Sequence, residues 1–304
     1  MSQPAKSLHL RLPATSANLG PGFDALGLAM AFYLTVEASA AAAFQIQATG
    51  RNADLCGDTV NSLILKTYKD VLAKNGKAAA PLHLVLENEI PLGMGCGSSA
   101  AALLAGVLLA DFFGDLGWSD QQILEEACRR EGHPDNVAAC FLGGMTASSD
   151  SKGQILTATC GNNINWSLLV ALPSTSLATE KARALLPSSY SRADAVANVQ
   201  NAALLVSAFA LNRGDLLRVA MQDRIHQPYR MDACPLLAKL LPLRDSPGVL
   251  GVALSGAGPS VLTIAEAGAE TEVAAAIRRA SDDPKLEIIQ TKIACAAQIK
   301  RRNG

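Results

Sequence analysis

The sequence predicts an α+β protein with two domains, on three observations. The chain has 304 residues, 49% hydrophobic and 17% charged, which is enough apolar material for two cores and shows no signature of disorder. Strand-like alternation and helix-like spacing of apolar residues both occur in each half of the chain. A polar stretch with glycine and asparagine, residues 147–165, separates the halves. We place the boundary near residue 160, which gives domains 1–160 and 161–304.

In the first half, strands are expected over 7–12 and 81–88, where apolar and polar side chains alternate. Between them, apolar residues recur at helical spacing over 59–76 and stop at a glycine. A second helix, almost entirely apolar and rich in alanine, is expected over 98–114. A third is expected over 118–132, because Ser119 suits its N-cap and Gly132 its end.

The second half opens with a hairpin and connection at 147–165 and a strand at 166–172. Helices are expected near 191–212 and 214–224. Residues 248–266 then indicate two apolar strands around a glycine turn, followed by an alanine-rich helix and a strand at 285–291. The chain shows no internal repeats.

Composition excludes several classes of function. A net charge of −1 argues against a large basic face for nucleic acid. The N-terminal residues lack an apolar leader, and the longest apolar run is too short for a bilayer and is broken by Asp111, so we expect no membrane segment. Seven scattered cysteines without a CxxC pair indicate reduced thiols in a cytoplasmic protein.

A glycine-rich stretch before the second helix, "IPLGMGCGSSAAALLAG", predicts a phosphate site. Alternating glycines let backbone N–H groups surround an anion, and the helix N-terminus adds partial positive charge. A serine hydroxyl there can reach a phosphate oxygen or Mg²⁺. The expected cradle comprises Pro91, Leu92, Gly93, Met94, Gly95, Cys96, Gly97, Ser98, Ser99, Ala100 and Ala101.

This stretch has three other interpretations. A Walker loop is excluded because no lysine follows the glycines. A dinucleotide fingerprint is disfavoured because Pro91 interrupts the approach and the following segment is another helix. A tight turn without a ligand stays open.

Two further stretches are unusual. "PATSANLGPGFDALGLAM" (13–30) places Asn18 and Asp24 among glycines and apolar residues, as a loop delivering polar groups to a cleft would. "SGAGPS" (255–260) is a glycine turn between two apolar strands, and alone it is a weak signal.

Together, in this order and spacing, the three stretches resemble the three motifs of the GHMP kinases, a family of small-molecule kinases. Within that family, "SANLGPGFD", "EGHPDNVA" (131–138), "TEKARALLP" (179–187) and "PYR" (228–230) are most similar to the homoserine kinases. The resemblance covers nearly the whole chain. It departs from the family pattern at Cys96, where leucine is usual, and at Ala139, where proline is common.

The resemblance implies a fold and a reaction. The N-terminal domain would carry a left-handed βαβ unit and the C-terminal domain would be ferredoxin-like, with the active site in the cleft between them. ATP and L-homoserine would give ADP and O-phospho-L-homoserine, a step toward threonine, with Mg²⁺ as cofactor.

The resemblance also assigns residues. Asn61 would join the phosphate cradle in binding ATP, and Ser99 with Glu131 would hold Mg²⁺, with Glu125 as the alternative to Glu131. The homoserine site would comprise Asn18, Asp24, His133, Asn136, Thr179, Arg183 and Arg230. Two arginines suit a carboxylate, because a guanidinium fork binds it through parallel hydrogen bonds.

Catalysis would involve Ser99, Asn136 and Asp135, and whether Asp135 is a general base stays open because orientation and charge stabilisation by Asn136 could suffice. Two other functions also stay open. One is a GHMP kinase for mevalonate or a sugar, and the other is a non-catalytic ATP-binding relative. Homodimer formation is left undecided.

Overall fold

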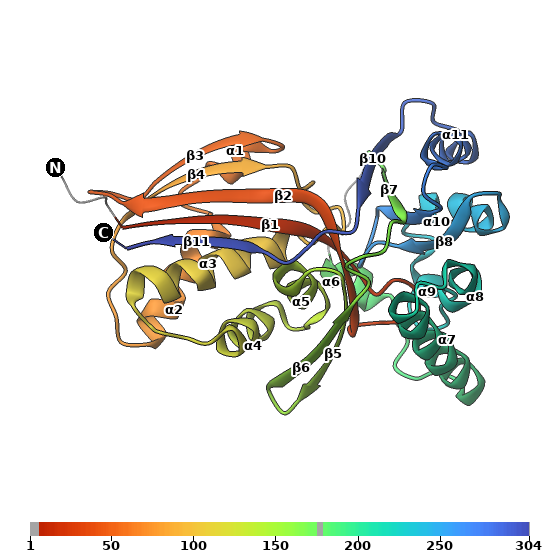
Figure 1. Cartoon of the computed structure of the whole chain (residues 1–304), viewed down its shortest axis with the longest axis horizontal. Coiled ribbons are helices and arrows are strands. Elements are labelled where there is room, and N and C mark those ends of the chain that lie inside the picture. The colour runs from red at the N-terminus through yellow and green to blue at the C-terminus, as the bar shows by residue number, and fades with distance from the viewer. Residues whose placement is uncertain (1–5, 175–178, 304) are drawn as a thin grey trace.

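The computed structural model describes residues 6–174 and 179–303 and shows two lobes, each built on its own sheet (Figure 1). The first sheet has the order β11-β1-β2-β4-β3, and a β5–β6 hairpin extends it from β2. Its strands are β1 (Ser7–Ala17), β2 (Leu26–Ala40), β3 (Gln45–Gly50), β4 (Leu82–Asn88), β5 (Met145–Ser151), β6 (Gln154–Cys160) and β11 (Gln298–Arg302).

The longest strand, β2, is absent from the sequence prediction. It runs antiparallel to β1 along most of both strands, and β1 itself continues past the predicted end at residue 12. The first five residues of β2 are all buried, so its apolar residues do not alternate there and the period-two signal is lost.

A parallel β3–β4 pair is joined by helices α1 (Ala53–Cys56) and α2 (Leu63–Lys74), which gives the βαβ unit that the family resemblance implies. Helices α2, α3 (Ser98–Gly114), α4 (Asp120–Glu131) and α5 (Asp135–Leu142) cover one face of the first sheet (Figure 1). Helix α3 spans the predicted residues and is buried along most of its length, while Ser98 and Ser99 at its start are accessible.

The second sheet has the order β10-β7-β9-β8 with antiparallel neighbours. Along the chain, β7 (Ser167–Leu172), a helical segment containing α7 (Arg192–Ala210), β8 (Val249–Leu254), β9 (Val261–Ala265), α11 (Glu270–Ser281) and β10 (Glu287–Lys292) follow one another. This βαββαβ order with the first and third strands central is the ferredoxin-like arrangement. The predicted fold class is therefore confirmed.

Shorter helices connect these elements: α6 (Thr179–Ala184), α8 (Leu217–Ala220), α9 (Gln227–Arg230), α10 (Pro235–Leu240) and 3₁₀ turns at Gly214–Leu216 and Leu241–Asp245. Pro228 follows the helix expected near 214–224. In the structure it lies in the first turn of α9, where its missing N–H costs no hydrogen bond.

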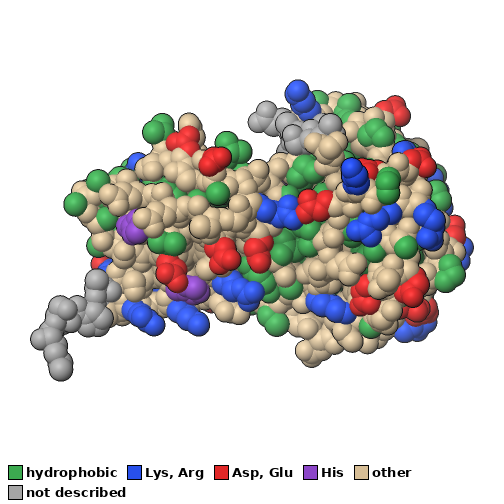
Figure 2. Space-filling view, turned by 90° about the horizontal axis from the view of Figure 1, so that it is seen from above, with side chains coloured by type: hydrophobic (Ala, Val, Ile, Leu, Met, Phe, Trp, Pro, Cys, Tyr) green, Lys and Arg blue, Asp and Glu red, His purple; other side chains and the backbone are tan. Residues whose placement is uncertain are grey.

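The last strand, β11, returns to the first sheet and pairs with β1, so Ser7 and Arg302 lie side by side (Figure 1). Along the chain, the first sheet gives way to the second between β6 and β7. All seven cysteines are free thiols. In the part of the chain that the structure describes, no helix combines the length and apolar character needed to span a bilayer. On the face in Figure 2, positive and negative side chains are intermixed.

Candidate active site

The three glycine-rich stretches of the sequence meet in the structure. The backbone N–H of Thr15 donates to the carbonyl of Cys96 (3.0 Å), and that of Gly256 donates to Ala17 (3.1 Å). Ser255 Oγ donates to the Gly95 carbonyl at 2.7 Å. These bonds tie the end of β1 and the 255–260 turn to residues 91–97, the phosphate loop, which leads into α3.

The alternating glycines of the phosphate loop are required by backbone conformation. Gly93, Gly95 and Gly97 all have φ near +70°, the left-handed region that favours glycine. A Cβ on Gly95 would lie 2.2 Å from the Ser255 carbonyl oxygen, and one on Gly97 would lie 1.8 Å from Thr15 Oγ1. The loop therefore packs against both other stretches because it has no side chains at these points.

A polar cavity of about 210 Å³ lies where the stretches meet. It is lined by Ala17, Asn18, Phe23, Asp24, Gly93, Gly95, Gly97, Ser98, Ser99, Glu131, His133, Asp135, Asn136, Arg183, Arg230, Gly256 and Ala257. Thirteen of these seventeen residues are in the site expected from the sequence. They come from both halves of the chain.

The remaining predicted residues lie elsewhere. Pro91, Cys96, Ala100 and Ala101 are buried behind the cavity, and Met94 packs against the core. Burial raises the pKa of the Cys96 thiol to about 12, which fits a packing residue and not a nucleophile. Thr179 opens α6, and its side chain lies outside the described residues.

A second, apolar cavity of about 320 Å³ adjoins the polar one, and the two share Ser98 and Ser99 at the start of α3. It is lined by Leu34, Leu55, Cys56, Asn61, Ser62, Leu63, Ile64, Leu86, Asn88, Ile90, Leu92, Ser98, Ser99 and Ala102. The predicted Asn61 lies here, and its amide donates to Asp58 at 2.7 Å.

The two arginines that line the polar cavity differ in whether a carboxylate pairs with them. Arg183 forms a bidentate ion pair with Asp24, at 2.6 and 3.0 Å, and this bond raises the pKa of Arg183. Arg230 is 1% exposed and donates to the Ala182 carbonyl and to His226 Nδ1, but no carboxylate among the described residues pairs with it. Burial and the nearby charge of Arg183 lower the pKa of Arg230. A buried cation without a counter-ion is costly, so this part of the cavity suits an anionic ligand.

Another part of the polar cavity is formed by the start of α5 and the residues just before it. His133 Nδ1 and the backbone N–H of Asn136 both lie 2.6 Å from Asp135 Oδ1. Burial lowers the pKa of His133, but its bond to Asp135 and the surrounding negative charges outweigh burial, so the pKa of His133 is raised. Asp24, His133 and Asp135 bring ligand atoms within 4.8 Å of one another.

A third group lies at the N-terminus of α3, where Ser99 Oγ donates to Glu131 Oε2 at 2.8 Å. Burial raises the pKa of Glu131. Glu125, the alternative metal ligand, pairs with Gln121 and does not line the polar cavity. The Ser99 hydroxyl and the Glu131 carboxylate are hard oxygen donors of the kind Mg²⁺ prefers.

Asn18 is placed differently from the other substrate candidates. It is buried in the left-handed conformation, donates to the Gly256 carbonyl at 3.0 Å and accepts from the Asp24 N–H at 3.0 Å. The Nδ2 end of its amide therefore holds the first stretch to the 255–260 turn, and the Oδ1 end holds the Asn18–Asp24 loop of the first stretch together.

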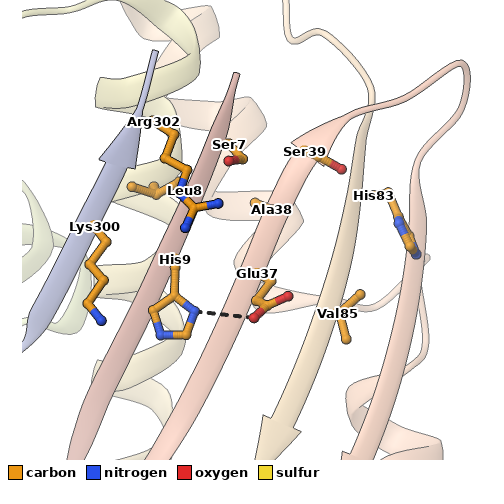
Figure 3. Close-up of a pocket in the computed structure, with 10 residues that line it drawn as sticks. All are labelled: Ser7, Leu8, His9, Glu37, Ala38, Ser39, His83, Val85, Lys300 and Arg302. Carbon is orange, nitrogen blue, oxygen red and sulfur yellow. Dashed lines mark ion pairs between the residues drawn. The ribbon is translucent and has the colours of Figure 1, made fainter. Parts of the chain in front are cut away.

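Another hollow, of about 460 Å³, lies on the uncovered face of the first sheet (Figure 3). Its side chains include His9, 3.4 Å from Glu37, and Lys300 and Arg302 on the edge strand. It has no glycine-lined backbone and no helix N-terminus, so we do not place the chemistry there.

Sequence reasoning missed most of the apolar cavity and Phe23, whose ring lies 5.4 and 5.5 Å from the guanidinium carbons of Arg183 and Arg230. A signal for the cavity was present: Leu55 and Leu63 stand in a polar segment and are 68% and 37% exposed in the structure.

Comparisons with known proteins agree with this architecture. The model described as GHMP kinases N terminal domain matches residues 62–144, and that described as GHMP kinases C terminal matches 205–283. The fold, the glycine-rich stretches and these matches show that the chain belongs to the GHMP kinase family.

Relatives within the family are more specific. A homoserine kinase of Solibacter usitatus is 50% identical over 274 residues, 89% of each chain. One of Desulfitobacterium hafniense is 42% identical, over 84% of this chain and 86% of its own. The crystal structure of homoserine kinase from Cytophaga hutchinsonii superposes with a TM-score of 0.83 at 25% identity, covering 99% of both chains.

A more distant structure, L. major mevalonate kinase in complex with R-mevalonate, has a TM-score of 0.72 at 15% identity and covers 97% of this chain and 100% of its own. At that identity the likeness shows the fold alone. The fold therefore does not select the acceptor, and side chains in the polar cavity must do so.

Proposed function

We propose that this chain transfers the terminal phosphoryl group of ATP to the side-chain hydroxyl of L-homoserine, forming O-phospho-L-homoserine and ADP. The observation that carries the proposal is the composition of the polar cavity. A buried guanidinium without a carboxylate partner faces the same small space as two carboxylates, beside the glycine loop of a kinase fold. Such a space suits a zwitterion that also bears a hydroxyl.

ATP would lie across the two adjoining cavities. The apolar cavity suits a flat base, and the N–H groups of the phosphate loop and the first turn of α3 suit the phosphates. Because Ser98 and Ser99 line both cavities, the terminal phosphate would enter the polar one. The base is thereby separated from the acceptor by the start of a single helix.

Mg²⁺ fits the Ser99–Glu131 pair. When bound, the ion neutralises phosphate charge during transfer. The Asp24, His133 and Asp135 group is less suited to a cation of this kind, because Arg183 already occupies Asp24 and His133 binds Asp135. We assign Asp24 in this group to the substrate ammonium.

Binding of the acceptor would break the ion pair between Arg183 and Asp24. Its carboxylate would bind Arg230 and Arg183, and its ammonium would take the place of Arg183 beside Asp24. A ligand lacking either charged end would leave a cavity charge unpaired. The hydroxyl would then lie toward Asn136, at the end of the cavity nearest Ser99 and the terminal phosphate.

We assign the chemical step to positioning and charge stabilisation, without a general base. Asp135 Oδ1 already accepts from His133 and from the Asn136 N–H at 2.6 Å, so the carboxylate acts by fixing its two neighbours. Phosphoryl transfer needs little covalent assistance when donor and acceptor are aligned and phosphate charge is compensated.

The proposal is tested with the purified chain, ATP and a panel of acceptors assayed for ADP release, with and without Mg²⁺. We expect release with L-homoserine that requires Mg²⁺, and little with mevalonate or a hexose. Stronger activity on mevalonate or a sugar would reassign the acceptor. ATP binding without turnover on any acceptor would identify a non-catalytic relative.

A further inference from the structure

Thr15, a residue of β1 outside the polar cavity, contacts the amide of Asn136. Its Oγ1 donates to Asn136 Oδ1 at 2.7 Å. On the other side of the amide, Asn136 Nδ2 lies 3.4 Å from Asp135 Oδ1. A carboxylate oxygen only accepts hydrogen bonds, so the NH₂ group must face Asp135 and the amide oxygen must face Thr15. The two contacts agree on one orientation of the amide.

The position of Thr15 is itself fixed. The residue is fully buried, and its backbone N–H donates to the Cys96 carbonyl in the phosphate loop. Its hydroxyl occupies the space that a Cβ on Gly97 would need, 1.8 Å away. The glycine therefore makes room for this hydroxyl, and the hydroxyl reaches from β1 past the loop to α5.

We propose that Thr15 is a positioning residue for phosphoryl transfer, which holds the Asn136 amide so that it presents N–H and not C=O to the reacting groups. The inference rests on the proposed function and deepens it. One N–H of the amide faces Asp135, and the other has no partner among the described residues and belongs to a cavity-lining side chain.

This orientation has a chemical consequence. An amide N–H can donate to the acceptor hydroxyl oxygen or to an oxygen of the transferred phosphoryl group, and so can stabilise negative charge there. An amide carbonyl in the same place would repel the phosphoryl oxygens and could only accept a hydrogen bond from the acceptor hydroxyl. Because this N–H would occupy only one lone pair of the hydroxyl oxygen, the other lone pair would stay available for attack on phosphorus.

The test is steady-state kinetics of Thr15→Val, which keeps the shape of the side chain and removes the hydroxyl, beside Thr15→Ser, which keeps the hydroxyl. We expect kcat of the valine variant to fall roughly 3- to 10-fold, the size of one neutral hydrogen bond, with KM values for ATP and homoserine within about twofold. The serine variant should recover wild-type kcat. Thr15→Ala serves where valine does not pack beside Gly97.

A double-mutant cycle separates positioning from packing. In an Asn136→Ala background, Thr15→Val should have no further effect on kcat, because the amide it orients is gone. An equal loss in both backgrounds, a raised KM for ATP, or unchanged kcat in the single variant would each overturn the inference. The matched control is Thr263→Val, a buried threonine of β9 whose hydroxyl has no partner in the described residues, and it should behave as wild type.

The wild-type assay keeps the two proposals apart. Absence of homoserine-dependent ADP release by the wild type contradicts the proposed function itself. Wild-type turnover together with an unaffected Thr15→Val variant contradicts only the role of Thr15.

Discussion

Replacing Arg230 by methionine tests the carboxylate side of the acceptor site. Arg230 is 1% exposed, lines the polar cavity and pairs with no carboxylate among the described residues, so its charge is free to bind a ligand anion. Methionine retains much of the volume and removes the charge and the fork of donors. Arg230→Lys retains the charge without the fork and is the matched variant.

The expected size follows from one charge-assisted hydrogen-bonded contact. Such contacts contribute about 1.5–3 kcal/mol, which corresponds to a loss of roughly 10- to 150-fold in kcat/KM for homoserine. ATP affinity should change much less, because Arg230 does not line the apolar cavity in which the base would bind. The lysine variant should recover part of the loss.

The assay compares L-homoserine with 3-aminopropanol, which lacks only the carboxylate. Arg230→Met should lower activity on homoserine and leave the already poor activity on 3-aminopropanol unchanged. Thermal unfolding of each variant checks that the chain remains folded. Equal losses on both acceptors would refute the assignment of Arg230 to the carboxylate.

Three further predictions address the other parts of the site. Gly97→Val should weaken ATP binding roughly 10-fold or more, because the φ of 71° at this position is unfavourable for a β-branched residue and the added Cβ would displace the Thr15 hydroxyl. Wild-type ATP affinity measured by calorimetry would contradict the assignment of this loop to phosphate binding. Glu131→Gln should raise the Mg²⁺ concentration needed for half-maximal activity while Glu125→Gln should not, and the reverse result would move the metal to Glu125. Because burial raises the pKa of Glu131, this carboxylate should take up a proton as pH falls, starting above the ordinary glutamate pKa of about 4.3, and the wild type should then need more Mg²⁺. If the Mg²⁺ requirement of the Glu131→Gln variant rises equally with falling pH, another group causes the effect.

Local signals in the sequence were sufficient for the elements with clear ends. Helix α4 begins after Ser119, which caps it with Gln122 in a capping box, and it ends at Gly132 in the left-handed conformation, as expected. Helix α3 follows its glycine loop at the predicted residue. These helix ends are determined by residues close together in the chain, so a single sequence is enough to predict them.

Features set by tertiary packing could not be predicted in this way. Strand β2 is buried on both faces where it begins, and β11 joins a sheet whose other strands lie in the first half of the chain. The Asp24–Arg183 pair joins residues 159 positions apart, and the Thr15–Asn136 contact joins residues 121 apart. No local pattern reports such contacts, which is why the resemblance could propose candidate site residues while their pairing became visible only in the structure.

The most direct test of the central claim is identification of the product. Purified protein is incubated with ATP, Mg²⁺ and L-homoserine, and the mixture is followed by ³¹P NMR and mass spectrometry, with the Ser99→Ala variant in parallel. We predict one phosphomonoester on the side-chain oxygen of homoserine for each ADP formed, and a much lower rate in the variant. ADP formed with inorganic phosphate alone, or a phosphorylated product only from a different acceptor, would contradict the account.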